Sequence, residues 1–379
     1  MAQVPGPYAE RSLPFSLAQD CIVNHSPYSE NDFETQQNLR RDSLIIDMHA
    51  HALAERFLHD MAKTPVAGLR AERGGDGYWV IRRQGDDRKS SIDTNLHDLP
   101  ARLESLKRRD VALQLFAPPP FMLAWPGGAA GTELVRALNA ASHGIARESE
   151  GRMEMLSVLA LGEPEAAVSE LQHAVDTYGV RGVMMPSSAG GRPLDGAEFA
   201  PLFELIERLN LVVFMHPTSA VTSERFGMYG LHVLVGWPFE TTLAVTRMIF
   251  NGLLERHPRL KLVLAHGGGN LVFLRGRLDS AYDANGWEAD PYFRQHISQR
   301  PSAYLDRLYY DTCALSEDSN RFTIQTMGAD RVVFGSDYPF DIGDPEGRRA
   351  VPVLDSLSVA DREKIHCVNA LRLLEDAGS

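Results

Sequence analysis

Eight short apolar runs recur along the chain from Leu44 onward, and they constrain the fold more than any other feature of the sequence. Polar residues follow each run, and a stretch with helical periodicity usually comes next, as at 133–148, 164–178, 199–210 and 241–258. The runs occupy residues 44–47, 111–117, 155–161, 180–185, 211–216, 260–266, 308–314 and 331–337. Nearly continuous apolar strands that alternate with helices are typical of a buried parallel sheet. Eight such units predict an α/β fold, the (β/α)8 or TIM barrel.

A doubly wound open sheet is the alternative architecture for the same alternation. Such sheets usually carry a glycine-rich phosphate-binding loop after the first strand, and no such loop follows Asp47. A length of 379 residues corresponds to two or three average domains. However, α/β barrels run past about 250 residues as a single unit. We therefore expect one barrel over residues 43–379.

Two segments stand outside the regular alternation. Residues 1–42 show little periodicity, and we expect an N-terminal extension that wraps on the body or on a partner subunit. Residues 52–95 form an insertion between the first strand and its helix, and residues 77–89 within it predict a β-hairpin closed by Gly-Asp-Asp. An insertion at this point emerges at the carboxyl ends of the strands, where barrels keep their active sites, so we expect a lid or substrate loop there.

The composition excludes several classes of protein. With 44 % hydrophobic and 23 % charged residues, the chain has the balance of a globular protein and not of a disordered one. The net charge of −12 disfavours binding to nucleic acid. A signal peptide and a membrane span are not expected, because the N-terminus has no basic start before an apolar run and the longest apolar runs are only of strand length. Three scattered cysteines offer no CxxC motif and fit a reducing, cytoplasmic compartment.

His49 and His51, at the end of the first strand, give the strongest chemical signal. Residues two apart on a strand project to the same side, so both imidazoles face the mouth of the barrel together. Divalent metals such as zinc favour imidazole ligands. Taken alone, the pair is as consistent with two core or surface histidines as with a metal site.

Three further strands end in residues of the metal-ligand type. His216 ends the fifth strand, His266 the sixth and Asp337 the eighth. Each by itself is explained more simply as a hydrogen-bonded structural residue or a turn cap. Together with the histidine pair, however, they place five polar side chains at the carboxyl ends of four strands, which is where barrels carry their catalytic residues. The joint pattern predicts a metal site.

This pattern of a His-x-His pair, two single histidines and an aspartate resembles that of the amidohydrolase superfamily. Within it, residues 234–269 and 328–340 resemble the aminocarboxymuconate-semialdehyde decarboxylase group, whose members are metal-dependent decarboxylases. The resemblance extends from about Leu44 to the end of the chain and is weakest over residues 52–95 and 120–200. Residues 1–42 lie outside it.

The resemblance implies a role for each matched residue. His49, His51, His216 and Asp337 correspond to the ligands of one Zn²⁺ per subunit, and His266 to a catalytic histidine outside the ligand set that deprotonates the metal-bound water. Asp337 is thereby both a ligand and a catalytic residue. The fourth strand ends without the carbamylated lysine of binuclear relatives, which favours a single metal. Mn²⁺, Co²⁺ or Fe²⁺ suit the same donors.

The resemblance also implies arginines that bind a carboxylate, because a planar guanidinium matches a carboxylate with two hydrogen bonds. Arg277 follows His266 by eleven residues. At that spacing the family has an arginine that reaches the active site of the neighbouring subunit, which implies a homodimer. Arg275 is the nearby alternative. Arg82 and Arg83, in the insertion hairpin, are alternatives for a second substrate-binding arginine.

Two aromatic residues are further candidates for substrate contact. Trp237 follows the fifth strand and is predicted to form a wall over a planar substrate, although core packing explains it equally well. Phe121 follows the second strand and is predicted to touch the substrate. Thr218 stands where close members of the family carry an aromatic residue, so one substrate contact differs from theirs.

The sequence as a whole predicts a carboxy-lyase of aromatic compound catabolism. It would be a metal-dependent, non-oxidative decarboxylase of an unsaturated or aromatic carboxylic acid, with no nucleic-acid or membrane partner. Relatives on the same scaffold hydrolyse C–C bonds or hydrate such acids, so a metal-dependent hydrolase or hydratase is the first alternative. A non-catalytic metal- or ligand-binding barrel is the second, and the intact ligand set argues against it.

Overall fold

Short parallel strands lie at the centre of the molecule and overlap the eight apolar runs of the sequence. The computed structural model describes residues 44–75, 77–83, 89–122, 128–218, 224–285, 291–375 and 377–378. Its parallel strands are β1 (Ile45–Asp47), β5 (Val111–Phe116), β6 (Met153–Met155), β7 (Gly182–Pro186), β8 (Val212–His216), β9 (Lys261–Leu264), β10 (Tyr309–Asp311) and β11 (Val332–Val333).

These strands close into a ring. They pair in the orders β1-β5-β6 and β7-β8-β9-β10-β11, and each of these pairs is parallel. Beyond β6, Ser157 bridges to β7 by accepting from the Met184 N–H at 2.9 Å. Beyond β11, the His51 N–H donates to the Tyr338 carbonyl at 2.7 Å, and the Asp337 N–H donates to the His49 carbonyl at 2.8 Å. These two junctions complete the (β/α)8 barrel predicted from the sequence, and residues of the expected metal site form the second one.

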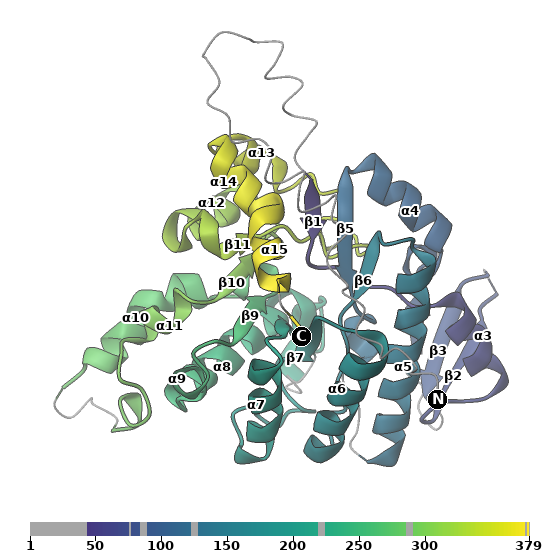
Figure 1. Ribbon diagram of the computed structural model, residues 1–379, viewed down its shortest axis with the longest axis horizontal. Coiled ribbons are helices and arrows are strands. Elements are labelled where there is room, and N and C mark those ends of the chain that lie inside the picture. Colours follow the sequence, from purple (N-terminus) through teal and green to yellow (C-terminus); the bar gives the residue numbers. More distant parts are fainter. Residues whose placement is uncertain are drawn as a thin grey trace, which may run out of the picture.

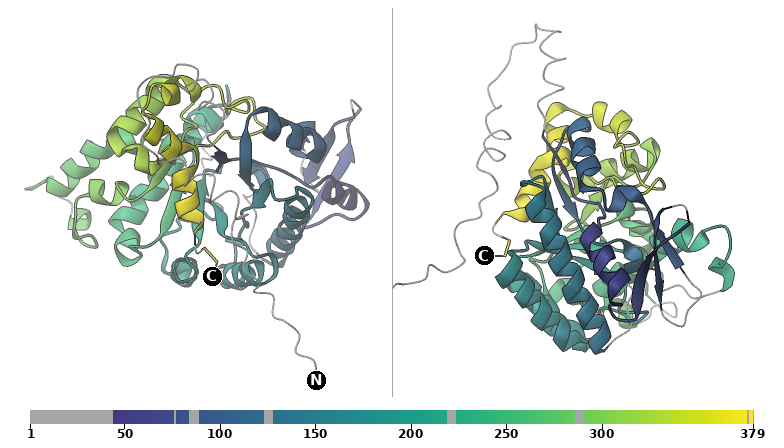
Figure 2. Two further views of the ribbon diagram at one scale, coloured as in Figure 1. Left: turned by 45° about the horizontal axis from the view of Figure 1, so that its top comes forward. Right: turned by 90° about the vertical axis from the view of Figure 1, so that its right-hand side faces the viewer.

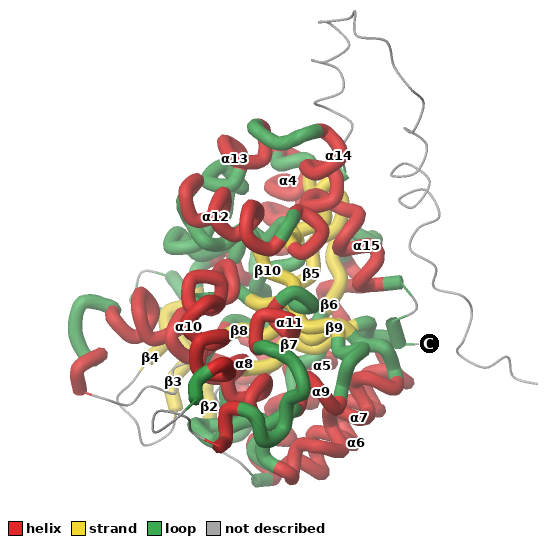
Figure 3. The backbone as a smooth tube through the Cα atoms, turned by 90° about the vertical axis from the view of Figure 1, so that its left-hand side faces the viewer, coloured by secondary structure: helices red, strands yellow, loops and turns green. Residues whose placement is uncertain are grey.

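Helices surround the strands on the outside (Figures 1 and 3). They are α4 (Leu99–Arg108), α5 (Ala129–Glu148), α6 (Pro164–Tyr178), α7 (Ala200–Arg208), α8 (Trp237–Phe250), α9 (Leu253–Arg256), α10 (Leu271–Asp283), α11 (Pro301–Leu305), α12 (Glu317–Met327), α13 (Val351–Asp355), α14 (Val359–Glu363) and α15 (Asn369–Leu374). The single helix predicted over 241–258 is wrong, because Gly252 separates α8 from α9 with a φ of 77°. A Cβ there would meet the His296 carbonyl oxygen at 2.4 Å.

Apolar side chains fill the barrel and the space between the strands and the helices. Met184 and Phe214 belong to one buried cluster, whereas their neighbours Met185 and Val213 belong to another, so successive side chains of β7 and β8 pack on opposite faces of the sheet. Every residue of β7 and β8 is buried. The body of the barrel is therefore a packed core, and the site must lie at the ends of the strands.

The insertion after β1 is larger than the predicted hairpin. It contains α3 (Glu55–Lys63), followed by an antiparallel sheet of β2 (Leu69–Arg73), β3 (Trp79–Arg83) and β4 (Lys89–Ile92). β3 and β4 form the predicted hairpin, whose connecting residues 84–88 lie outside the described residues. The helix and the first strand were not predicted. Figures 1 and 2 show this unit on the outside of the barrel beside α5.

Three other predictions concern the N-terminal extension, membrane spans and the cysteines. Residues 1–42, with the role predicted for them, lie outside the described residues. No helix within the described ranges is long and apolar enough to cross a bilayer. Cys313 is a buried free thiol, and the reducing compartment inferred from the cysteines stays a prediction.

Candidate metal centre

The five ligand-type side chains converge at the carboxyl ends of the strands. The ring centroid of His216 lies 5.1 Å from that of His49, 5.0 Å from that of His51 and 5.0 Å from that of His266. Asp337 Oδ1 lies 3.2 Å from His49 Nε2 and 3.1 Å from His51 Nε2. Residues at or just beyond the ends of β1, β8, β9 and β11 therefore share one small volume.

Hydrogen bonds fix the tautomer of three of the four histidines. His49 Nδ1 donates to Asp311 Oδ2 at 2.7 Å, and His216 Nδ1 donates to the Pro217 carbonyl at 2.8 Å. His51 Nδ1 points to the Pro118 carbonyl at 3.4 Å. Carboxylate and carbonyl oxygens only accept, so each Nδ1 carries the proton and each Nε2 presents a lone pair. These three Nε2 atoms and Asp337 Oδ1 are buried without a hydrogen-bond partner.

This donor set fits a divalent metal. Four acceptor atoms that face one another in a dry site repel unless a cation lies among them. Burial lowers the pKa of both His51 and His216, which keeps their rings neutral. Burial also lowers the pKa of His49, but the charge of Asp337 and the hydrogen bond to Asp311 outweigh it and raise that pKa to about 10. Without metal, a second proton on His49 supplies a positive charge that stabilises the cluster of three imidazoles and one carboxylate.

The carboxyl group of Asp337 is ionised in this cluster. Burial opposes its ionisation, but the charge of His49 and the neighbouring His266 and His51 rings hold its pKa well below the ordinary range. The centre therefore offers a negative oxygen to a cation at neutral pH.

His266 differs from the other histidines of the cluster. Its side chain is 13 % exposed, against 0 % for those of His49 and His51. Its Nε2 lies 3.6 Å from Asp337 Oδ2, and its buried Nδ1 has no hydrogen-bond partner to fix the tautomer. The ring stacks on Trp237 at 5.9 Å between centroids. Its ligand atom is nevertheless within 4.8 Å of those of His49, His216 and Asp337, so distance alone does not separate His266 from the ligands.

A constrained backbone carries two of these side chains. His266 and Asp337 both have a φ of 56°, in the left-handed region that residues with a Cβ rarely adopt. The glycines after His266 permit a tight turn. A Cβ on Gly268 would meet the Tyr310 ring at 2.6 Å, and one on Gly269 the Pro238 carbonyl oxygen at 2.4 Å. The packed backbone, more than the side chain itself, thus directs His266 toward the centre.

A cavity of about 580 Å³ opens beside the centre, a size suited to a small organic ligand. His266, Asp337 and Trp237 line it together with the apolar side chains of Leu234, Phe273, Phe322 and Ile342. Asp318 and Asn270 add polar atoms. None of the described residues that line this cavity is a lysine or an arginine.

The other predicted substrate residues lie away from this cavity. Phe121 is partly buried against a hydrophobic core cluster. Arg82 pairs with Glu72 within the antiparallel sheet, and Arg83 stands opposite Leu69 in the same sheet. Arg277 is exposed on α10. Of the five predicted substrate-contact residues, only Trp237 lines the cavity.

Asp311, at the end of β10, is a functional residue that sequence reasoning missed. Its Oδ2 accepts from His49, while its Oδ1 accepts from the Gly267 N–H at 2.8 Å and the Cys313 N–H at 3.1 Å. It therefore fixes the His49 ring and ties it to the turn that follows His266. The available signal was the same as for the ligands, namely a polar residue at the end of an apolar run.

The Asp311→Asn variant should bind metal about 10–100-fold more weakly, as is usual when the partner of a ligating histidine is lost. An amide has one acceptor oxygen, so it cannot accept both from His49 and from the two backbone N–H groups. Competition against a coloured chelator measures the affinity. Asp306→Asn, at a surface pair with Arg275, is the matched control and should bind as the wild type does. A wild-type affinity in Asp311→Asn would refute this role.

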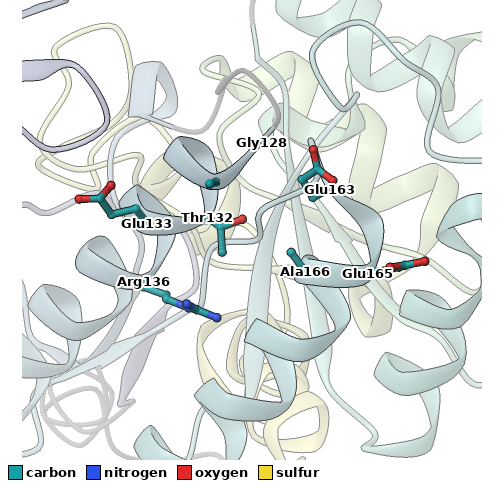
Figure 4. A pocket seen from close by; sticks show the side chains of 8 residues that line it. Gly128, Thr132, Glu133, Arg136, Glu163, Glu165 and Ala166 are labelled. Atoms are coloured by element: carbon teal, nitrogen blue, oxygen red, sulfur yellow. The ribbon is translucent and has the colours of Figure 1, made fainter.

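A second cleft, of about 600 Å³, lies between the first turns of α5 and α6. Figure 4 shows Glu133 and Arg136 projecting from α5 and Glu163 and Glu165 from the start of α6. None of the predicted site residues lines it. Of the two cavities, only the one at the mouth of the barrel adjoins the candidate metal centre.

Comparison with known proteins gives a family and relatives for this geometry. The amidohydrolase family model matches residues 46–375. A 2-amino-3-carboxymuconate-6-semialdehyde decarboxylase from Dictyostelium discoideum is 30 % identical over 344 residues, which covers 88 % of this chain and 92 % of that protein. A gamma-resorcylate decarboxylase from a Rhizobium species is 30 % identical over 247 residues, covering 60 % of this chain and 72 % of that protein.

Solved structures share the fold. A 5-carboxyvanillate decarboxylase from Sphingomonas paucimobilis aligns with a TM-score of 0.71 and 22 % identity, covering 88 % of this chain and 99 % of that one. A dihydroxybenzoic acid decarboxylase from Polaromonas, solved with manganese and 2-nitroresorcinol, aligns with a TM-score of 0.68 and 20 % identity, covering 88 % and 97 %.

Proposed function

Since this chain belongs to the amidohydrolase family, we propose that it is a metal-dependent, non-oxidative decarboxylase of an unsaturated or aromatic carboxylic acid. The observation that carries the proposal is the buried donor set of three imidazoles and one carboxylate, which opens onto a cavity of small-molecule size. Decarboxylation is also the reaction named for relatives that align over most of this chain.

In this proposal His49, His51, His216 and Asp337 hold one divalent cation. Zinc suits the imidazole-rich donor set, and manganese is the alternative, since two solved relatives hold it. The bound cation supplies a Lewis acid at the inner end of the cavity. His266 stays outside the ligand set because, unlike the other three histidines, it has no acceptor to fix its tautomer and its side chain is partly exposed.

His266 then moves the proton that decarboxylation requires. The C–CO₂ bond of the substrate is replaced by a C–H bond, so a proton must reach the carbon that bears the carboxylate, and the electrons of the broken bond remain on the substrate when CO₂ leaves. The His266 ring lines the cavity with its Nε2 3.6 Å from Asp337 Oδ2, and an imidazole exchanges protons readily near neutral pH. Stacking on Trp237 limits how far the ring can rotate.

The walls of the cavity favour a planar, largely apolar substrate. Trp237 and Phe322 offer aromatic faces, and Leu234 and Ile342 offer aliphatic contact. Because no arginine or lysine is found among the described lining residues, the cation that binds the substrate carboxylate comes from elsewhere. The bound metal and a second subunit are two candidate sources.

Arg277 does not line the cavity of its own subunit, but it remains a candidate for binding the substrate of a second subunit. Arg277 and Phe273 lie one helical turn apart on α10, and both are exposed, Phe273 by 80 %. Phe273 also lines the cavity, as does Leu234, which is another exposed large apolar side chain. Phe239, in α8, is exposed as well. Exposed apolar clusters of this kind are typical of interfaces. We therefore include in the proposal a homodimer in which Arg277 serves the partner's cavity.

Mixing two impaired variants tests that arrangement. Arg277→Met should lower kcat/KM about 10–100-fold, because a charged hydrogen-bond partner of the carboxylate is lost, and His266→Ala should lower kcat about 10²–10⁴-fold. After subunit exchange, a mixed dimer regains one complete site, in the Arg277→Met subunit. Activity should return on mixing, whereas Arg275→Met, which breaks a surface pair with Asp306, should remain active alone. No recovery in a preparation that contains mixed dimers would contradict the arrangement.

The reaction itself is tested by a substrate screen with the metal-loaded protein. Benzoic acids with one or two hydroxyl groups and muconic acids are followed by ultraviolet absorbance, CO₂ trapping and mass spectrometry in H₂¹⁸O. We expect one CO₂ for each acid consumed and no ¹⁸O in the organic product. Incorporation of ¹⁸O without CO₂ would identify a hydrolase or hydratase instead, and binding of acids without turnover would identify a binding protein.

A further inference from the structure

Two buried arginines contact one aromatic ring next to the metal centre. The guanidinium carbon of Arg102 lies 4.5 Å from the centroid of the Tyr338 ring, and that of Arg109 lies 4.8 Å from it. Arg102 is 2 % exposed, and the Arg109 side chain is 4 % exposed. Burying two like charges side by side costs free energy. We call Arg102, Arg109 and Tyr338 the arginine clamp.

Arg102, on α4, holds the backbone of a proposed metal ligand. Its Nη2 donates to the carbonyl of His51, and also to that of Asn95 at 3.1 Å. The N–H of His51 in turn donates to the carbonyl of Tyr338 at 2.7 Å. His51 is therefore bonded through both its N–H and its C=O to members of the clamp. Tyr338 directly follows Asp337, so the same contacts set the position of the carboxylate.

A second path leads from Arg102 to the other side of the centre. Arg102 Nη1 donates to Gln114 Oε1 at 2.9 Å, and Gln114 Nε2 donates to Asp47 Oδ2 at 2.8 Å. The other oxygen of Asp47 accepts from the His49 N–H at 3.2 Å and from the Ser336 N–H at 3.0 Å. The network thus connects the backbone around His49 with that around Asp337.

Opposite charge and an aromatic face stabilise the buried arginines of the network. Asp47 is the counter-ion, with Oδ2 at 3.7 Å from Arg109 Nη1, and the face of Tyr338 stabilises the guanidinium groups. Burial lowers the pKa of Arg102 to about 10, which leaves it charged at neutral pH. A lysine would keep the charge but would lose the planar fork that reaches His51, Asn95 and Gln114 together.

We propose that Arg102 is a positioning residue for metal binding, which fixes His51 relative to Asp337 through the His51 carbonyl and the Tyr338 ring. The inference rests on the proposed ligand set. Arg102 does not line the cavity beside the centre, so its effect must pass through the metal ligands and not through contact with substrate.

Metal binding to folded variants tests this role. Arg102→Lys and Arg102→Met are compared with Arg108→Met. Arg108 lies on the same helix as Arg102, and its replacement removes an exposed ion pair with Glu346. Circular dichroism reports folding, competition titration gives the Mn²⁺ affinity, and the visible absorption of the Co²⁺ form reports ligand geometry. Arg102→Lys and Arg102→Met should bind Mn²⁺ about 10–100-fold more weakly, with a shifted Co²⁺ spectrum. Arg108→Met should match the wild type in both.

The outcomes separate the inference from the proposed function. If the wild type fails to bind one metal per chain, the proposed function itself is wrong. If the wild type binds metal and a folded Arg102 variant keeps both its affinity within threefold and its Co²⁺ spectrum, only the positioning role is overturned. If neither Arg102 variant folds while Arg108→Met does, the role is overturned as well, because Arg102 then serves the fold.

Discussion

Replacing His266 by alanine should lower kcat about 10²–10⁴-fold, the usual contribution of a positioned proton-transfer group, while one metal ion remains bound per chain. The expectation follows from the differences between His266 and the other histidines. Its Nδ1 has no partner to fix the tautomer, and its ring faces the cavity against Trp237. Turnover of the best substrate from the screen and metal content by mass spectrometry are measured on the same preparation.

A remote histidine provides the control for this variant. His173→Ala changes a residue on α6 that bonds Thr177 at the surface, and it should retain wild-type turnover. Loss of metal together with activity in His266→Ala would place His266 among the ligands, as its distance from His49, His216 and Asp337 allows. Full activity in His266→Ala would remove it from the reaction altogether.

Removing the metal should lower kcat by more than about 10³-fold and leave the barrel folded. The donors occupy the ends of the strands, whereas apolar side chains such as Phe214 and Met184 form the buried hydrophobic core. Returning one equivalent of Zn²⁺ or Mn²⁺ should restore activity and raise the Tm, since an ion that binds only the native state stabilises it. Activity and Tm are followed as metal is titrated into chelator-treated protein.

Each result of this titration is informative. Turnover that persists after complete removal of metal would refute the mechanism. Recovery that requires two equivalents would indicate a binuclear centre, contrary to the missing lysine after the fourth strand. The identity of the ion that restores the highest kcat tests the preference for zinc.

The sequence predicted the barrel well because parallel buried strands leave a plain signal. All eight apolar runs overlap strands, and the ligand-type residues follow them at the same end. Strand bounds were harder. The run at 155–161 overlaps β6 only at Met155, because Val158 and Leu161 are buried in the segment beyond the strand. Burial, and not strand structure, makes those residues apolar, and periodicity does not distinguish the two.

The side chains that hold the proposed metal ligands could not be predicted from the sequence, because they are far from the ligands along the chain. Arg102 and Asp311 lie 51 and 262 residues from the histidines that they hold, and an arginine on an amphipathic helix looks like a solvated one. Their function exists only once the strands have closed. The roles given to Arg82, Arg83 and Phe121 stay predictions, since none of these residues lines the described cavity.

The most direct test of the account is a crystal structure of the metal-loaded protein with anomalous data at the absorption edge of the bound metal. The account predicts one strong peak per chain, about 2.0–2.2 Å from Nε2 of His49, His51 and His216 and from a carboxylate oxygen of Asp337, with His266 outside bonding distance. A peak bonded to His266 in place of His51, or metal bound anywhere other than among these side chains, would contradict it.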